Sequence, residues 1–186
     1  ICYNRYISAH EALNEKESVV ATRSILAVKS QGKDTWYGVY VHWDGYPSGW
    51  PSELKHIIDV GFAGDLDAAI DGLILSHPAG WSVLAADWTQ APANMRIAGG
   101  SNAPLYYPTD EGAMDIEGSM AHIPARCMGT EYVYVIDRDG RTVTALDIEW
   151  KPDSTRLELK SLGAVSLDLP AAEFNAVMSD IDAGEE

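Results

Sequence analysis

The sequence has few cysteines, which argues against the two kinds of site that cysteine most often builds. Only Cys2 and Cys127 are present among 186 residues, and they are far apart and without CxxC spacing. We therefore expect neither a disulfide framework nor a zinc site of the usual type.

Basic residues are also scarce. The chain has 13 Lys and Arg against 28 Asp and Glu, which gives a formal net charge of −15. Binding to nucleic-acid phosphates depends on clustered Lys and Arg, so we expect no direct nucleic-acid partner. The acidic residues are scattered, which is typical of a solvated surface. The same surface would also suit a protein that mimics DNA and blocks a basic groove on a host protein.

Long apolar runs and catalytic signatures are absent as well. No apolar run approaches the ~20 residues that span a bilayer, and no basic-then-apolar signal layout begins the chain. We therefore predict a cytoplasmic protein without a membrane partner. The sequence contains no GxSxG, P-loop, HExxH or GxGxxG motif. His56, His77 and His122 are not spaced as a metal set, so we expect no metal and no cofactor.

The composition, 46% hydrophobic and 22% charged, is that of a globular domain. We predict one domain at residues 20–183, an N-terminal extension at residues 1–19 and an acidic tail at residues 184–186. Lys16-Glu17 can be encoded by a purine-rich sequence resembling a bacterial ribosome-binding site, so the extension is interpreted as translated leader before a start near Val20. The alternative is an ordinary N-terminal helix.

Apolar alternation and turn residues divide the rest of the chain into elements. Two strands, two helices, further strands and a last helix favour an α+β fold, with an antiparallel sheet and helices packed on one face. The pattern predicts strands at residues 23–29, 35–43, 131–136, 142–148 and 156–159, helices at residues 51–61, 65–77 and from Pro170 onward, and an irregular excursion with short elements at residues 80–129.

Residues 40–53 concentrate aromatic and hydrogen-bonding side chains between a strand and a helix start, where folds commonly bind ligands. Odd positions from 37 to 43 are apolar, whereas the even positions mix aromatic and polar side chains. Because side chains alternate across a strand, we predict that Trp43 lies in the core and that His42 and Asp44 project to one side.

Several roles remain open for these side chains. His42 and Asp44 could form a general base, a metal pair or an oriented donor to a ligand. Equally, Asp44 could bond backbone amides in a turn, and His42 could be a buried structural residue.

The nearby aromatic and charged residues have similar alternatives. Tyr40, Tyr46 and Trp50 could stack on a planar ligand, or pack the sheet against its first helix. Arg23 could clamp a phosphate or carboxylate, or pair with Asp44 or Glu131. The candidate ligand-binding residues are Arg23, Tyr40, His42, Asp44, Tyr46, Trp50 and Glu131.

Three short blocks resemble a family of small, mostly uncharacterised proteins of bacteriophages and actinobacteria. The blocks are Thr22-Arg23-Ser24, the distinctive His42-Trp43-Asp44-Gly45-Tyr46-Pro47 and Gly129-Thr130-Glu131-Tyr132-Val133-Tyr134. In that family the first strand lies at the extreme N-terminus, so the resemblance also implies a start near Val20. It implies a phage or mobile-element setting, and hence the host cytosol, and it brings no established activity.

These observations favour a non-catalytic accessory protein that binds a small planar or anionic ligand, such as a nucleotide-like signal in host defence. One alternative is a hydrolase or lyase that uses His42 and Asp44. The other is an acidic, DNA-mimic-like inhibitor of a host protein.

Overall fold

The structure is a computed structural model of the chain. The predicted extension at residues 1–19 and the last two residues of the acidic tail lie outside the described residues, as does most of the predicted excursion at residues 80–129. The structure describes residues 22–31, 35–76, 80–81, 84, 113–117, 120–121, 129–150 and 157–184.

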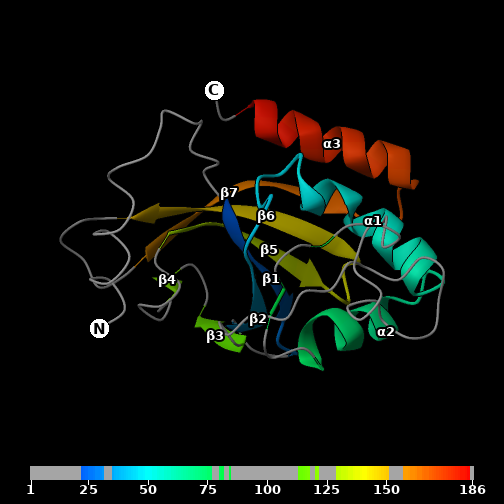
Figure 1. Cartoon of the computed structure of the whole chain (residues 1–186), viewed down its shortest axis with the longest axis horizontal. Helices are drawn as coiled ribbons and strands as arrows, with labels where there is room; N and C mark the ends of the chain where they lie inside the picture. The colour runs from blue at the N-terminus through cyan, green and yellow to red at the C-terminus, as the bar shows by residue number, and fades with distance from the viewer. Residues whose placement is uncertain are drawn as a thin grey trace, which may run out of the picture.

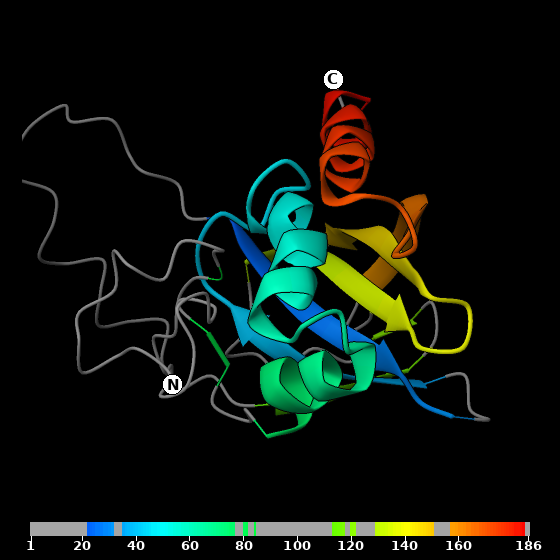
Figure 2. The same cartoon turned by 90° about the vertical axis from the view of Figure 1, so that its right-hand side faces the viewer.

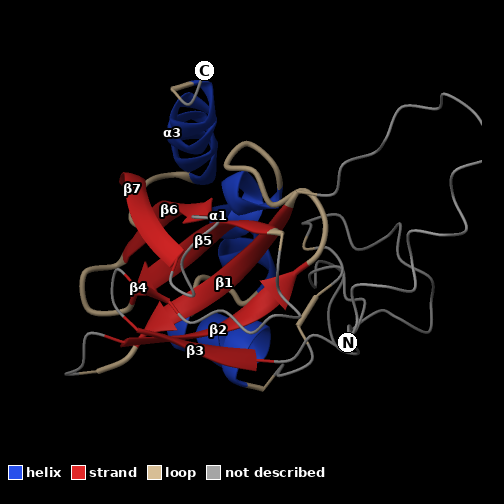
Figure 3. Cartoon of the chain, turned by 90° about the vertical axis from the view of Figure 1, so that its left-hand side faces the viewer, coloured by secondary structure: helices blue, strands red, loops and turns tan. Residues whose placement is uncertain are grey.

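Seven strands form one sheet (Figures 1 and 3). The strand order is β3-β2-β1-β5-β6-β7-β4, and every pair is antiparallel except β1–β5, which is parallel. The strands are β1 (Arg23–Lys29), β2 (Thr35–Val41), β3 (Ala113–Glu117), β4 (Met120–Ala121), β5 (Thr130–Asp137), β6 (Thr142–Trp150) and β7 (Leu157–Ser166).

In the described part of the chain, three helical segments accompany the sheet. The first runs as a 3-10 turn (Trp50–Glu53), α1 (Leu54–His56) and a π-helical turn (Ile57–Gly61). The second is α2 (Leu66–Ile70) continued by a π-helical turn (Asp71–Leu75), and α3 (Ala171–Ala183) is the third. Asp65 caps α2, because its Oδ1 accepts the Ala68 N–H at 3.0 Å. Within the described residues, no helix combines the length and the apolar character that crossing a bilayer requires.

Each face of the sheet carries its own buried cluster. One cluster joins alternate strand residues such as Leu26, Val39 and Tyr134 to buried side chains of all three helical segments. Figure 2 shows these helical segments in front of the sheet and above it. On the opposite face a second cluster is built from Ile25, Ala27, Tyr40, Val133, Val135, Leu146 and Ile148. Because both faces are buried, β1 and β5 read as continuous apolar runs.

The sheet curls until its two edges approach one another. β3 is one edge strand and β4 is the other, yet only residues 118 and 119 separate them in sequence. Three Cα–Cα steps of ~3.8 Å span at most about 11 Å, so the edges lie close at this point. The interior of a curl of seven strands is too narrow for helices and holds side chains. The cluster shared with the helical segments therefore lies on the outer face, and the second cluster lies inside.

The predicted α+β fold with a mostly antiparallel sheet is confirmed. Several details differ. The pairing of β1 with β5 is parallel, β2 ends at Val41 instead of residue 43, and the strand predicted at residues 156–159 continues as β7 to Ser166. The prediction that Trp43 belongs to the core is wrong, because this indole is 39% exposed. It lies in a bend beyond the strand end, where alternation across the sheet no longer applies.

Candidate functional site

A tight corner follows β2, and backbone hydrogen bonds hold it to β1. The Gly45 N–H donates to the Thr22 carbonyl at 2.9 Å, and the Trp50 N–H donates to the Asp44 carbonyl at 3.0 Å. Asp44 has φ +56°, a left-handed conformation that Asp tolerates better than most residues. Asp44 thus lies in a turn through its backbone conformation, whereas the predicted role depended on its side chain. No hydrogen bond of its carboxylate occurs within the described residues.

Two glycines let this corner close. A Cβ on Gly45 would lie 2.7 Å from both Cβ and Oγ of Ser24, and one on Gly49 would lie 2.2 Å from the Asp44 carbonyl oxygen. Real Cβ atoms do not approach so closely. Glycine at positions 45 and 49 is thus required by the backbone path.

Buried aromatic residues anchor the corner from below. Trp50 is 3% exposed, its Nε1–H donates to Ser24 Oγ at 3.0 Å, and its ring packs edge-on against Tyr134. The Tyr134 hydroxyl donates to the Gly45 carbonyl at 2.7 Å. Trp50, a candidate for ligand stacking, therefore lies in the core, and its polar atom is engaged by β1.

Above these anchors, His42 and Trp43 form the accessible part of the corner. The Tyr40 hydroxyl lies 2.9 Å from His42 Nδ1 and fixes the imidazole, while Tyr40 itself is 2% exposed. The rings of His42 and Trp43 meet edge-on, with centroids 4.7 Å apart. His42 is half-buried and Trp43 exposed, so an immobilised imidazole lies beside an open indole.

The remaining candidates lie at the same end of the sheet as the corner. Arg23 begins β1, Glu131 lies at the start of the parallel neighbour β5, and both are half-buried. The guanidinium of Arg23 passes over Gly129, where an added Cβ would lie 3.2 Å from Nη1. Tyr46, 38% exposed, and Asp44 lie on the outside of the corner. None of the ion pairs among the described residues joins Arg23 to Asp44 or Glu131.

The sequence matches no family model, no curated protein and no solved structure. The site is therefore assessed on its own geometry. Within the part of the chain that the structure describes, no three His, Cys, Asp or Glu side chains gather as a metal-binding group would require.

The environment of His42 leads us to expect that the free energy of unfolding depends on pH. Burial, and secondly the positive charge of Arg23, lower the pKa of His42 below its ordinary 6.5. The unfolded chain therefore takes up more protons as pH falls through about 6.5. The stabilisation linked to neutral His42 is present above that pH and is lost as pH falls through the lower folded-state pKa.

We expect the free energy of unfolding, measured with urea, to fall between about pH 7 and pH 5. In His42→Gln this fall should be smaller, whereas His56→Gln, at an exposed helix position, should retain it. An equal pH dependence in His42→Gln and the unmodified protein would contradict the assignment.

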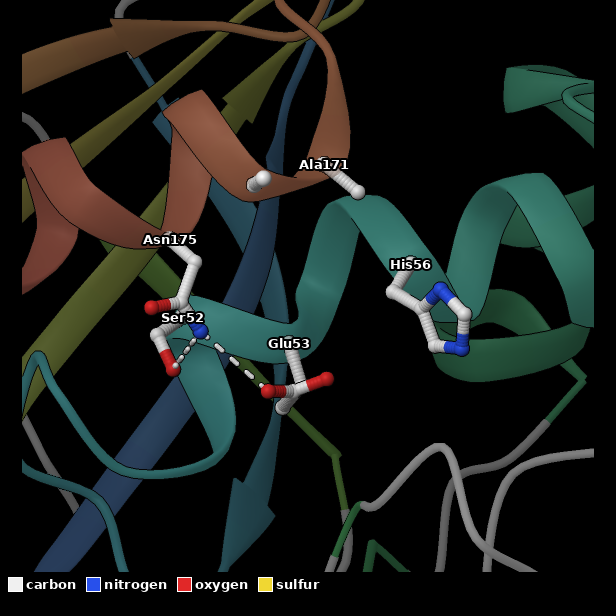
Figure 4. A pocket seen from close by; sticks show the side chains of 6 residues that line it. Ser52, Glu53, His56, Ala171 and Asn175 are labelled. Carbon is white, nitrogen blue, oxygen red and sulfur yellow. Dashed lines mark hydrogen bonds between the residues drawn. The ribbon is translucent and has the colours of Figure 1, made fainter.

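A groove that the sequence did not predict lies between the first helical segment and α3 (Figure 4). Its cavity measures about 370 Å³ and is lined by Ser52, Glu53, His56, Ala171, Ala172 and Asn175. Asn175 Nδ2 donates to Ser52 Oγ and to Glu53 Oε1, each at 3.2 Å. These bonds use both amide hydrogens and tie α3 to the helix after the corner. Because Asn175 and Glu53 are 122 positions apart, local sequence patterns could not predict their contact.

Proposed function

We propose that this chain is a non-catalytic binding protein that holds a small planar or anionic ligand at the corner after β2. The observation that carries the proposal is Trp43, an indole left 39% exposed beside an imidazole that Tyr40 holds in place. A large exposed aromatic side chain on a rigid, internally anchored turn offers stacking surface at little further cost in conformational entropy.

The groups around Trp43 favour a ligand that is both flat and negatively charged. The Trp43 and Tyr46 rings are accessible for stacking, and Arg23 places a positive charge close enough to affect His42. When the Tyr40 hydroxyl donates to Nδ1, the second ring nitrogen of His42 carries a proton and can donate to a ligand. A base or similar ring on the aromatics, with its anionic group toward Arg23, satisfies all of these groups.

The hydrogen bonding of His42 supports binding over catalysis. A general-base histidine is commonly oriented by a carboxylate, but here the Nδ1 partner is a tyrosine hydroxyl. The strand ends at Val41, so the expected alignment of His42 with Asp44 along a strand does not arise. The phage or mobile-element setting that the sequence blocks imply makes nucleotide-like host-defence signals the first ligand class to test.

The proposal predicts nucleotide binding that depends on Trp43. Isothermal titration with a panel of mono-, di- and cyclic nucleotides should find at least one ligand. Trp43→Ala should weaken binding about tenfold or more, since stacking on one base contributes roughly 1–3 kcal/mol. His42→Ala should also weaken it.

The matched control is Leu75→Ala, which removes an apolar side chain that is 45% exposed and lies on the second helical segment, outside the corner. This variant should bind as the unmodified protein does. Absence of binding to every nucleotide, or unchanged binding by Trp43→Ala, would overturn the proposal.

A further inference from the structure

A row of four side chains crosses the sheet at the end opposite the corner. Trp36 of β2 lies opposite Lys29 of β1, and Asp137 of β5 lies opposite Thr142 of β6. Lys29 Nζ and Asp137 Oδ2, 3.5 Å apart, join the two pairs. Strand alternation places all four on the face of the second cluster, which is the inner face of the curl.

The next row inward is made mostly of small residues, and a hollow lies between the outer row and the Val135 and Thr144 members of this row. Gly38, Ala27, Val135 and Thr144 lie opposite one another across the same four strands. The resulting cavity measures about 160 Å³ and is lined by the four residues of the outer row together with Val135, Thr144 and Leu146. At ~30 Å³ per water in the liquid, it has room for about five waters, and hence for one small ring.

The lining combines an aromatic wall with both donors and acceptors. Trp36 is half-buried, and its indole N–H makes no hydrogen bond within the described residues, although buried tryptophans usually find a partner. Val135 and Leu146 add apolar surface, and Thr142 and Thr144 add hydroxyl groups. The Lys29–Asp137 pair supplies a donor and an acceptor, each already partnered by the other.

The charged groups of the lining favour a neutral ligand over an anion. An anion beside Lys29 would also face the Asp137 carboxylate. The pKa of that carboxyl lies below its ordinary 3.8, chiefly because the Gly140 N–H bonds it, so it stays ionised at neutral pH. A neutral ligand avoids this repulsion and leaves the ion pair intact. A sugar ring is neutral, has an apolar C–H face for an indole, and carries hydroxyls that both donate and accept.

We propose that this mouth of the curled sheet is a second ligand site, which binds a single sugar-like ring stacked on Trp36 and hydrogen-bonded by Asp137, Lys29 and Thr144. The site is separate from the corner, because six residue steps along β1 place the two about 20 Å apart. Mouths of curled or closed sheets are common positions for small ligands.

The test is titration of the full chain with a panel of neutral monosaccharides, followed by NMR through the indole N–H resonances and the backbone amide resonances of β5 and β6. The Trp36 signal is assigned from Trp36→Phe. We expect saturable shifts of this signal with at least one sugar. Trp36→Leu should weaken binding about tenfold, and Thr144→Val, which keeps the side-chain shape, should weaken it less.

Trp43→Ala is the control at the distant corner and should bind the sugar unchanged, which distinguishes this site from the proposed function. Thermal unfolding of each variant establishes that it is folded. No saturable shift with any sugar, undiminished sugar binding by Trp36→Leu in the backbone amide resonances, or a stronger response of the Trp36 signal to nucleosides than to sugars would overturn the proposal.

Discussion

Replacing Gly49 with alanine is expected to destabilise the protein by about 3 kcal/mol. The new Cβ would lie 2.2 Å from the Asp44 carbonyl oxygen and 3.0 Å from its carbon. Neither backbone atom can rotate away, so the corner must open and lose the hydrogen bond from Trp50 N–H to Asp44. The urea midpoint should fall accordingly, with little change in the slope of the transition.

Gly184→Ala is the matched control for this substitution. A Cβ there would meet its nearest atoms at 3.5 and 3.6 Å, which is ordinary van der Waals contact. We expect a change within about 0.5 kcal/mol. Equal stability of the two variants would show that the corner tolerates a side chain at residue 49 and is not the tight turn described above.

Phe174→Ala should cost about 3–5 kcal/mol, the range for truncating a buried phenylalanine. Phe174 is 0% exposed and belongs to the cluster between the helices and the sheet. Val177 lies one turn further along α3, but it is 36% exposed.

Val177→Ala therefore serves as the control on the same helix and should cost less than about 1 kcal/mol. Urea unfolding monitored by circular dichroism separates the two outcomes. Similar losses in both variants would contradict the observed packing of α3, whereas the expected difference would establish that this helix is docked through Phe174.

The local parts of the fold could be predicted from the sequence, because their signals are local. The β1–β2 and β5–β6 hairpins follow from turn residues between apolar strands, and the cap at Asp65 from its place before an apolar helix. The parallel pairing of β1 with β5 could not be predicted. The chain between them, residues 30–129, is 100 residues long, and a continuous apolar run does not indicate which strand is its neighbour.

The candidate site shows the same division. The sequence located the corner correctly between β2 and the first helix, yet it reversed two tryptophans. Strand alternation was extended past Val41 and so placed Trp43 inside, whereas Trp50 was taken as available although Ser24 engages its indole. Only the positive φ of Asp44 and the long-range contact with Tyr134 decide which ring is exposed.

The burial of both sheet faces gives the corner a further importance. In most sheets a one-residue slip of a strand would move apolar side chains into solvent, and this penalty fixes the alignment. For β1 such a slip would only exchange one buried cluster for the other, so polarity specifies its alignment weakly. Two contacts specify the alignment of β1 instead. Gly38 leaves room for Ile25, and the Gly45 N–H donates to the Thr22 carbonyl. The motif thus determines which residues of β1 and β2 face each other.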